Sequence, residues 1–177
     1  MQHSNGFSLI ETIIIIAIIA IVSILVLPNI TTMLNQNQVT QQSHDFVTAV
    51  QLALSESETS GNKISICAKN STSDTCVAYT TVPDKTVWRN GWLIFSDKND
   101  NGIYDSTDTL LKVQANATNT VSITAPASTL TIVDGSKVTR GVGTFDFTPP
   151  NCKSNGTHRV KLTTNGYLTI EGVACTS

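Results

Sequence analysis

Apolar residues fill the chain from Phe7 to Leu27, a run of 21 residues in which only Ser8, Glu11, Thr12 and Ser23 are polar. At about 1.5 Å per residue, a helix of this length crosses a hydrocarbon core of about 30 Å. Ile and Val disfavour an isolated helix, but a chain in lipid must satisfy its own backbone hydrogen bonds, so a helix is expected nonetheless. The pattern predicts a transmembrane or assembly helix over residues 7–27.

From Pro28 to about Thr59 the pattern becomes amphipathic, and Gly61 supplies a stop. The apolar and small residues at helical spacing are Ile30, Met33, Leu34, Phe46, Ala49, Val50, Ala53, Leu54 and Ser57. We expect residues 28–60 to continue the helix, first in the membrane and then packed on a globular head. Pro28 removes a backbone hydrogen bond, which predicts a kink or local melting there.

After Gly61 the chain changes to short β-prone segments separated by Gly, Asn, Asp, Pro and Ser. The expected strands are Lys63–Cys67, Cys76–Val82, Trp92–Ser96, Thr109–Ala115, Val121–Ala125, Leu130–Val133, Thr144–Phe147, His158–Thr163 and Tyr167–Val173. The prediction is an α+β fold, in which one long N-terminal helix packs on a β-rich head over residues 61–177, built of two small sheets.

Glu11 places a carboxylate inside the apolar run, where charge is costly and points to function. No Lys or Arg precedes Lys63, so no basic side chain nearby in the sequence can neutralise it. A cut between Gly6 and Phe7 would create a new α-amine close to Glu11. In an assembly, Glu11 could then pair with the Phe7 amine of a neighbouring subunit.

The stretch Gly6-Phe-Ser-Leu-Ile-Glu11 and the apolar run after it resemble the class III signal of type IV pilins and pseudopilins. The resemblance implies that a prepilin peptidase removes residues 1–6 and that Phe7 is then methylated. Such leaders usually carry Lys or Arg, whereas this one has only His3, which removes the usual cue for orientation. An ordinary signal peptide would be cut after the apolar run at small residues, which are missing there. A plain single-pass anchor would explain neither Glu11 nor the Gly–Phe junction.

Four cysteines, Cys67, Cys76, Cys152 and Cys175, predict two disulfides in an exported chain. Three connectivities are possible, and we favour the local pairs Cys67–Cys76 and Cys152–Cys175. A zinc site is the alternative, but the chain has no C-x-x-C spacing and only His158 nearby. No metal or cofactor is therefore assigned.

Two further stretches resemble the GspH/FimT family of minor pilins and minor pseudopilins. They are the helix end, Val50-Gln-Leu-Ala-Leu-Ser-Glu-Ser57, and the segment Trp88–Gly102 with Asp105 and Thr109-Leu-Leu after it. Leu54 stands where the family's helix motif has Arg. The resemblance implies a structural subunit of a type IV pilus, acting in pilus biogenesis within a tip or priming complex. The alternatives are a minor pseudopilin of a type II secretion system and a DNA-binding pilin for natural transformation.

That resemblance also implies a location and partners. The precursor would be a single-pass inner-membrane protein with a periplasmic head, and the processed subunit would join an extracellular pilus or a periplasmic pseudopilus. Its partners would be other minor and major pilins, the prepilin peptidase and the inner-membrane assembly platform.

One loop has the spacing of a calcium site. Asp97, Asn99, Asn101, Gly102, Asp105 and Asp108 occupy positions one, three, five, six, nine and twelve. The last position holds Asp instead of the usual Glu, and strands instead of helices flank the loop. The alternative, which we favour, is a hairpin turn in which the Asp and Asn side chains bond their own backbone and Gly102 takes a positive φ.

Net charge gives no global signal for nucleic acid, since it is −2 with 11 basic and 13 acidic residues. The residues Gly166-Tyr-Leu-Thr stand where DNA-binding members of the family carry Gly-Arg-x-Arg. A modest basic set remains: Lys137, Arg140, Lys153, Arg159 and Lys161. DNA is therefore the weaker alternative partner.

No nucleophile, base and acid stand in a catalytic pattern, so we expect that the protein is not an enzyme. For Trp88 and Trp92 we expect roles in the core or in a turn.

Overall fold

The computed structural model describes residues 8–78, 87–115, 120–152 and 156–175, while the side chains of residues 24–29 and 87 lie outside that description. The chain divides into two compact units, Met1–Leu34 and Asn35–Ser177. One helix, α1 (Leu9–Ser60), contributes residues to both units. Among the described residues, no helix combines the length and the apolarity that a membrane crossing requires.

Local sequence explains where α1 ends. Gly61 follows its last residue with φ 67°, a conformation that glycine adopts without strain, and its N–H donates to the carbonyl of Ser57 over 3.0 Å. The Ser57 hydroxyl donates to the carbonyl of Asn62. Helical structure continues through Pro28, so the helix does not melt there, and the kink remains a prediction.

The first sheet has the strand order β3-β2-β1-β5-β6, with every neighbouring pair antiparallel. Its strands are β1 (Ile64–Ala68), β2 (Gly91–Ser96), β3 (Thr109–Ala115), β5 (Thr129–Val133) and β6 (Lys137–Arg140). All residues of β1 and β2 are buried, as expected of strands covered on both faces. A short 3-10 helix, η1 (Val87–Asn90), precedes β2.

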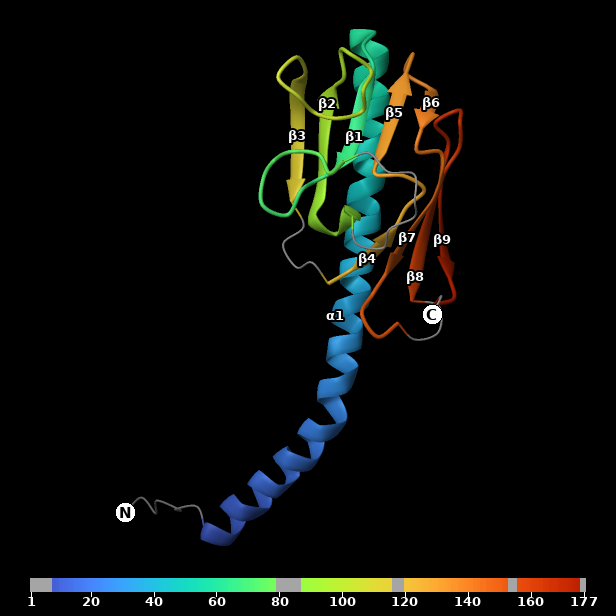
Figure 1. The fold of residues 1–177 in the computed structure, drawn as a ribbon. Coiled ribbons are helices and arrows are strands. Elements are labelled where there is room, and N and C mark those ends of the chain that lie inside the picture. The colour runs from blue at the N-terminus through green and yellow to red at the C-terminus, as the bar shows by residue number, and fades with distance from the viewer. Residues whose placement is uncertain (1–7, 79–86, 116–119, 153–155, 176–177) are drawn as a thin grey trace, which may run out of the picture. The chain divides into compact units, whose positions relative to one another are not determined.

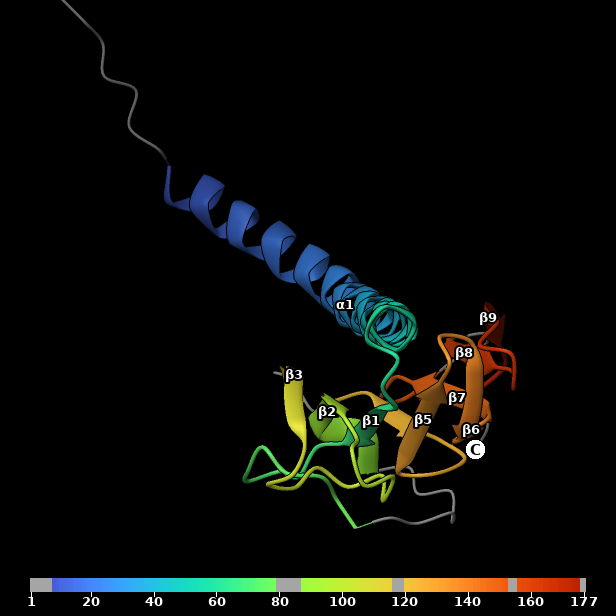
Figure 2. The same cartoon turned by 90° about the horizontal axis from the view of Figure 1, so that it is seen from above.

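The second sheet has the order β4-β7-β8-β9 and is also antiparallel. Its strands are β4 (Ser122–Thr124), β7 (Gly143–Thr148), β8 (Thr157–Leu162) and β9 (Leu168–Val173). In the unit formed by residues 35–177, the C-terminal part of α1 runs alongside both sheets, and β3 and β9 form opposite outer edges (Figures 1 and 2). The predicted α+β fold with two sheets and one helix is confirmed.

Phe46 of α1 lies at the centre of the core and is fully buried. Its ring contacts both tryptophans edge-on, with centroids 5.7 Å from Trp88 and 5.6 Å from Trp92. On the other side it contacts Phe145 at 4.5 Å and Phe147 at 5.8 Å. One side chain of the helix therefore joins η1, the first sheet and the second sheet. The expected core role of the two tryptophans is confirmed.

The strands differ from the expectation in two places. The segment predicted as a strand from Cys76 to Val82 forms only an isolated bridge between Cys76 and Lys69 in its described part, and residues 79–82 lie outside the description. Strand β6 was not predicted, because Lys137-Val-Thr-Arg140 offers only one apolar residue. It forms because Val138 is buried and because β5 supplies backbone partners through a register shift between Thr131 and Ile132.

Candidate assembly site

The first turns of α1 are apolar on every face. Its exposed side chains are Leu9, Ile10, Ile13, Ile14, Ile15, Ile16, Ile18, Ile19, Ile21 and Val22, with exposed fractions from 43% to 77%. A helix that is apolar all round requires an apolar environment on all sides, supplied by lipid or by other helices. This segment is therefore a candidate contact surface.

Two polar side chains in this segment bond the helix itself. The hydroxyl of Thr12 donates to the Ser8 carbonyl over 3.4 Å, and that of Ser23 donates to the Ile19 carbonyl over 2.7 Å. Glu11 lies in the first turn, where the positive end of the helix dipole favours an acid. Its carboxylate has no basic residue before Lys63 in the sequence. Gly6 and Phe7, the predicted cleavage junction, lie outside the described residues.

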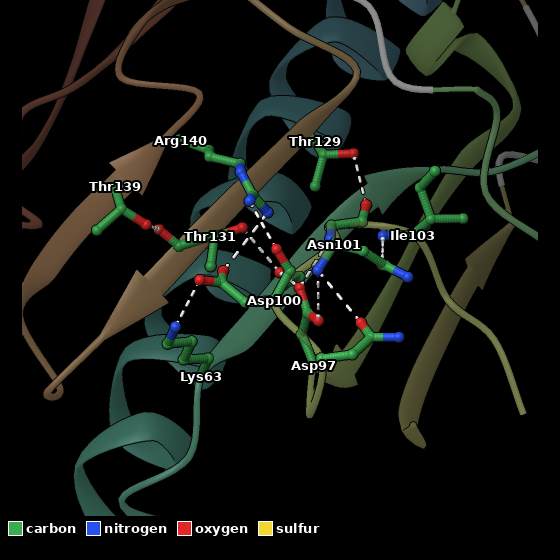
Figure 3. Close-up of polar contacts among 12 residues, drawn as sticks. Lys63, Asp97, Asp100, Asn101, Ile103, Thr129, Thr131, Thr139 and Arg140 are labelled. Carbon is green, nitrogen blue, oxygen red and sulfur yellow. Dashed lines mark hydrogen bonds and ion pairs between the residues drawn. The ribbon is translucent and has the colours of Figure 1, made fainter. Parts of the chain in front are cut away.

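The head carries a second candidate site, the loop between β2 and β3. Asp97 is 2% exposed and is held by several donors. Its Oδ2 accepts from the Ser65 hydroxyl at 2.8 Å and from the Gly102 N–H at 2.9 Å, while its Oδ1 accepts from the Asn101 N–H. The same Ser65 hydroxyl lies 2.8 Å from that of Thr131, so the loop is bonded into the first sheet (Figure 3).

Two further carboxylates organise the rest of this loop. Asp105 accepts hydrogen bonds from the backbone and hydroxyl of Thr107 and from the side-chain amides of Asn99 and Asn101. The bonds from Thr107 are the main reason that the pKa of Asp105 lies well below its ordinary value. Asp108 accepts from the backbone of Lys98 and Asp105.

Backbone geometry in the loop has the form of the predicted turn, since Gly102 has φ 74° and Asp100 has φ 59°. Within the described part of the chain, no three His, Cys, Asp or Glu side chains stand close enough to hold a metal ion. Calcium binding by Asp97, Asn99, Asn101 and Asp108 stays a hypothesis, testable by calorimetric titration of the full chain with Ca²⁺.

Basic side chains fix the outside of the same loop. Lys63 and Arg140 flank the carboxylate of Asp100, and Arg140 also donates to the Asp100 carbonyl over 2.7 Å (Figure 3). The hydrogen bond from Lys63 is the largest cause of the lowered pKa of Asp100. Arg140 is therefore engaged in holding the loop.

A second member of the predicted basic set is engaged as well. Arg159 on β8 makes a two-pronged contact with Asp146 on β7, with Nε–Oδ1 at 2.7 Å and Nη2–Oδ2 at 2.8 Å. This contact raises the pKa of Arg159. Lys137 and Lys161 are exposed, and Lys153 lies outside the described residues. The arginines thus have local partners, which does not favour a nucleic-acid surface.

Ser43 and His158 form the nearest approach to a nucleophile and base, with Ser43 Oγ 3.2 Å from His158 Nδ1. Ser43 is fully buried, and its hydroxyl donates to the carbonyl of Thr40. In the described residues no carboxylate bonds the other ring nitrogen. The pair holds α1 against β8 and has no geometry for catalysis.

Disulfides join Cys67 to Cys76 and Cys152 to Cys175, the local connectivity of the three possible ones. Cys67 is buried in β1, and Cys76 Sγ accepts a hydrogen bond from the N–H of Tyr104. The first disulfide therefore lies against the loop between β2 and β3. The second joins the segment before β8 to the segment after β9.

A family model described as "Type II transport protein GspH" matches residues 42–169 of this chain. The chain belongs to the GspH family. A model of the prokaryotic N-terminal methylation motif matches residues 1–27. Together, these matches make the chain a subunit of the minor pilin or pseudopilin class.

One solved structure shares the fold of this GspH-family chain, the type IV minor pilin FimU of Pseudomonas aeruginosa. The TM-score is 0.54 at 20% identity, and the match covers 80% of this chain and 95% of the other. No curated protein matches the chain.

Sequence reasoning about this GspH-family head found the loop at Asp97–Asp108 but missed two contacts. It did not bring Arg140 to the loop, nor His158 to Ser43, because both contacts join residues far apart in the sequence. A period-two pattern could have placed His158 on the helix-facing side of β8, where Val160 and Leu162 are buried.

Proposed function

We propose that this protein is a minor subunit of a type IV pilus that is inserted through the inner membrane, processed after Gly6 and assembled through the first turns of α1. The observation that carries the proposal is the all-round apolar exposure of Leu9–Val22 with a single acid, Glu11, in its first turn. A GspH-family head follows this segment. The head would face the periplasm before assembly and the outside of the filament afterwards.

The assembly step follows from solvation. An ionised group at the centre of a bilayer costs about 2.5–3.5 kcal/mol or more, so Glu11 favours any environment that offers a positive partner. Cleavage after Gly6 frees the α-amine of Phe7, which remains charged whether or not it is methylated. In a bundle of like helices the Phe7 amine of one subunit can approach Glu11 of the next. Apolar burial is conserved on transfer, because helix contacts replace lipid contacts.

The test replaces Glu11 by Leu in the full-length chain, in cells that express the assembly machinery. We expect Glu11→Leu to insert in the membrane and to be processed as the wild type, but to appear in sheared pili at about a tenth of the wild-type level or less, since loss of a pair worth about 1.4 kcal/mol already costs tenfold. The measurement is an immunoblot of membrane and pilus fractions.

The matched control is Thr12→Leu, which removes a polar group from the same turn. Because the Thr12 hydroxyl bonds its own helix, we expect this variant to reach pili normally. Wild-type incorporation of Glu11→Leu would refute the pairing. Mass spectrometry of the mature protein tests processing separately, because the proposal requires a chain that begins at Phe7.

A minor pseudopilin of a type II secretion system is the second candidate, favoured by the description of the matching family model. The two candidates differ in their partners. Cross-linking in cells followed by pull-down of the full chain would recover pilins of a type IV pilus under the first and pseudopilins under the second. In either setting, the prepilin peptidase and the inner-membrane assembly platform are its expected contacts before assembly.

A further inference from the structure

Two of the three histidines in the chain belong to the elements that pack together where α1 contacts the second sheet. His44 is exposed on α1, and its neighbour Ser43 is fully buried against β8. His158, half-buried on β8, places its Nδ1 3.2 Å from the Ser43 hydroxyl. The third histidine, His3, belongs to the predicted leader. In a chain cleaved after Gly6, any imidazole signal therefore comes from His44 or His158.

The hydrogen bonds of Ser43 determine which ring nitrogen of neutral His158 carries the hydrogen. The Ser43 hydroxyl has one hydrogen, and it donates that hydrogen to the Thr40 carbonyl over 2.9 Å. The Ser43 oxygen must therefore accept from His158, which places a hydrogen on Nδ1. The lone pair of neutral His158 then lies on Nε2, and that nitrogen takes the next proton.

The surroundings of His158 do not favour protonation of its Nε2. Burial lowers the pKa of His158, and the charge of His44 lowers it further. The strands on either side of β8 carry Asp146 and Glu171, but both act on Arg159. Arg159 is the next residue along β8 and so points to the opposite face of the sheet.

The neighbouring acid on α1 is Asp45, which is half-buried. It is not among the causes of the lowered pKa of His158, which are burial and His44. Among the described residues, the one titratable group that acts on His158 through its charge is therefore another base. Acid would therefore place a positive charge on a half-buried ring at this contact.

We propose that the contact between α1 and β8 is acid-sensitive: protonation of half-buried His158 loosens the helix segment around Ser43 from the second sheet, while Phe46 keeps the rest of the core closed. This acid sensitivity does not depend on the proposed function, because it needs only the two histidines and the contact between α1 and β8.

The pH window follows from the direction of the shift. The folded state holds the pKa of His158 below its ordinary value of about 6.5, so the unfolded or opened state binds more protons as the pH falls. The contact is at full strength above about pH 6.5 and weakens progressively below it.

The test measures hydrogen exchange of the full chain in detergent micelles between pH 7.5 and pH 5, corrected for the intrinsic pH dependence of exchange. In the wild type we expect a several-fold loss of protection at low pH in the peptides that cover residues 40–47. In His158→Asn, whose side-chain amide can replace the Nδ1 donor but takes no proton, protection of the same peptides should be independent of pH. His44→Gln should show a smaller loss than the wild type.

An unchanged wild-type protection would overturn the proposal, as would a loss that is equal in wild type and His158→Asn. If His158→Asn does not fold, NMR titration of the two wild-type imidazoles decides the matter. A His158 ring that titrates at or above its ordinary value refutes the inference, and one that titrates below His44 supports it.

Discussion

Replacing Phe46 by Ala tests how the head is held to its helix. The ring is fully buried and touches four aromatic rings, two on the side of η1 and the first sheet and two on the second sheet. A buried Phe→Ala change typically costs about 3–5 kcal/mol, and each aromatic pair adds about 0.5–1.5 kcal/mol beyond its buried area. With four such pairs lost, we expect Phe46→Ala at the upper end, about 4–5 kcal/mol.

That loss is a large share of the total stability of a domain, which is about 5–15 kcal/mol. Urea denaturation of the full chain in detergent micelles measures it, with tryptophan fluorescence as the signal. The chain has two tryptophans, Trp88 and Trp92, and both contact Phe46, so the signal reports directly on this cluster. The midpoint should fall with little change in slope.

Leu52→Ala is the matched control, because Leu52 lies on the same helix but is 37% exposed. We expect it to stay within about 0.5–1 kcal/mol of the wild type. Phe46→Leu keeps most of the apolar volume and loses the ring contacts, so it should cost about 1–2 kcal/mol. A loss below about 1 kcal/mol in Phe46→Ala, or one no larger than in Leu52→Ala, would refute the central role of this ring.

Three further predictions concern the head, each measured by the same denaturation of the full chain. Gly91→Ala should destabilise the head by at least about 2 kcal/mol, because a Cβ there would lie 1.9 Å from a backbone oxygen of β3 and because φ is 100°. Its control is Gly172→Ala, where an added Cβ meets nothing within 4 Å and the stability should hardly change. Asp97→Ala should cost about 2–4 kcal/mol, because it leaves several buried donors without their acceptor; a loss below about 0.5 kcal/mol would contradict the buried network. Replacing both Cys152 and Cys175 by Ser should cost about 3 kcal/mol, as expected for a loop closed over 23 residues, and an unchanged midpoint would show that this disulfide adds nothing to stability.

Sequence patterns predicted most of this fold because the periodicity is strong where the elements are long or buried. The run from Phe7 and the period-four residues from Phe46 to Ser57 predict α1, and alternating or continuous apolar stretches predict β2, β5 and β8. Strand β6 could not be predicted from the sequence, because its residues are mostly polar and its pairing depends on β5. The segment after Cys76 looked like a strand because Val and Tyr favour strands, but in its described part it forms only one isolated bridge, between Cys76 and Lys69.

Some residues of the candidate sites could likewise be found from the sequence, whereas their long-range contacts could not. Glu11 could be singled out from the sequence, because one charge in an apolar run is a local anomaly. The loop at Asp97 could be found from its spacing, but not its attachment to Ser65 and Arg140, which depends on how distant strands pair. A period-two pattern could place His158 on the helix-facing side of β8, but not against Ser43, which lies 115 positions away in the sequence.

The end of α1 determines how the head would bear mechanical load. Gly135 lies so close to Glu58, and Gly166 to Leu54, that an added Cβ would approach within 2.6 Å and 2.9 Å, and the N–H of Gly135 donates to the Ser57 hydroxyl. Tension applied along the helix would therefore act on these close contacts in shear, so that many must break together. In a filament that is pulled, the head should stay attached to its helix until it unfolds as a whole, and its lifetime under force would be set by its unfolding rate.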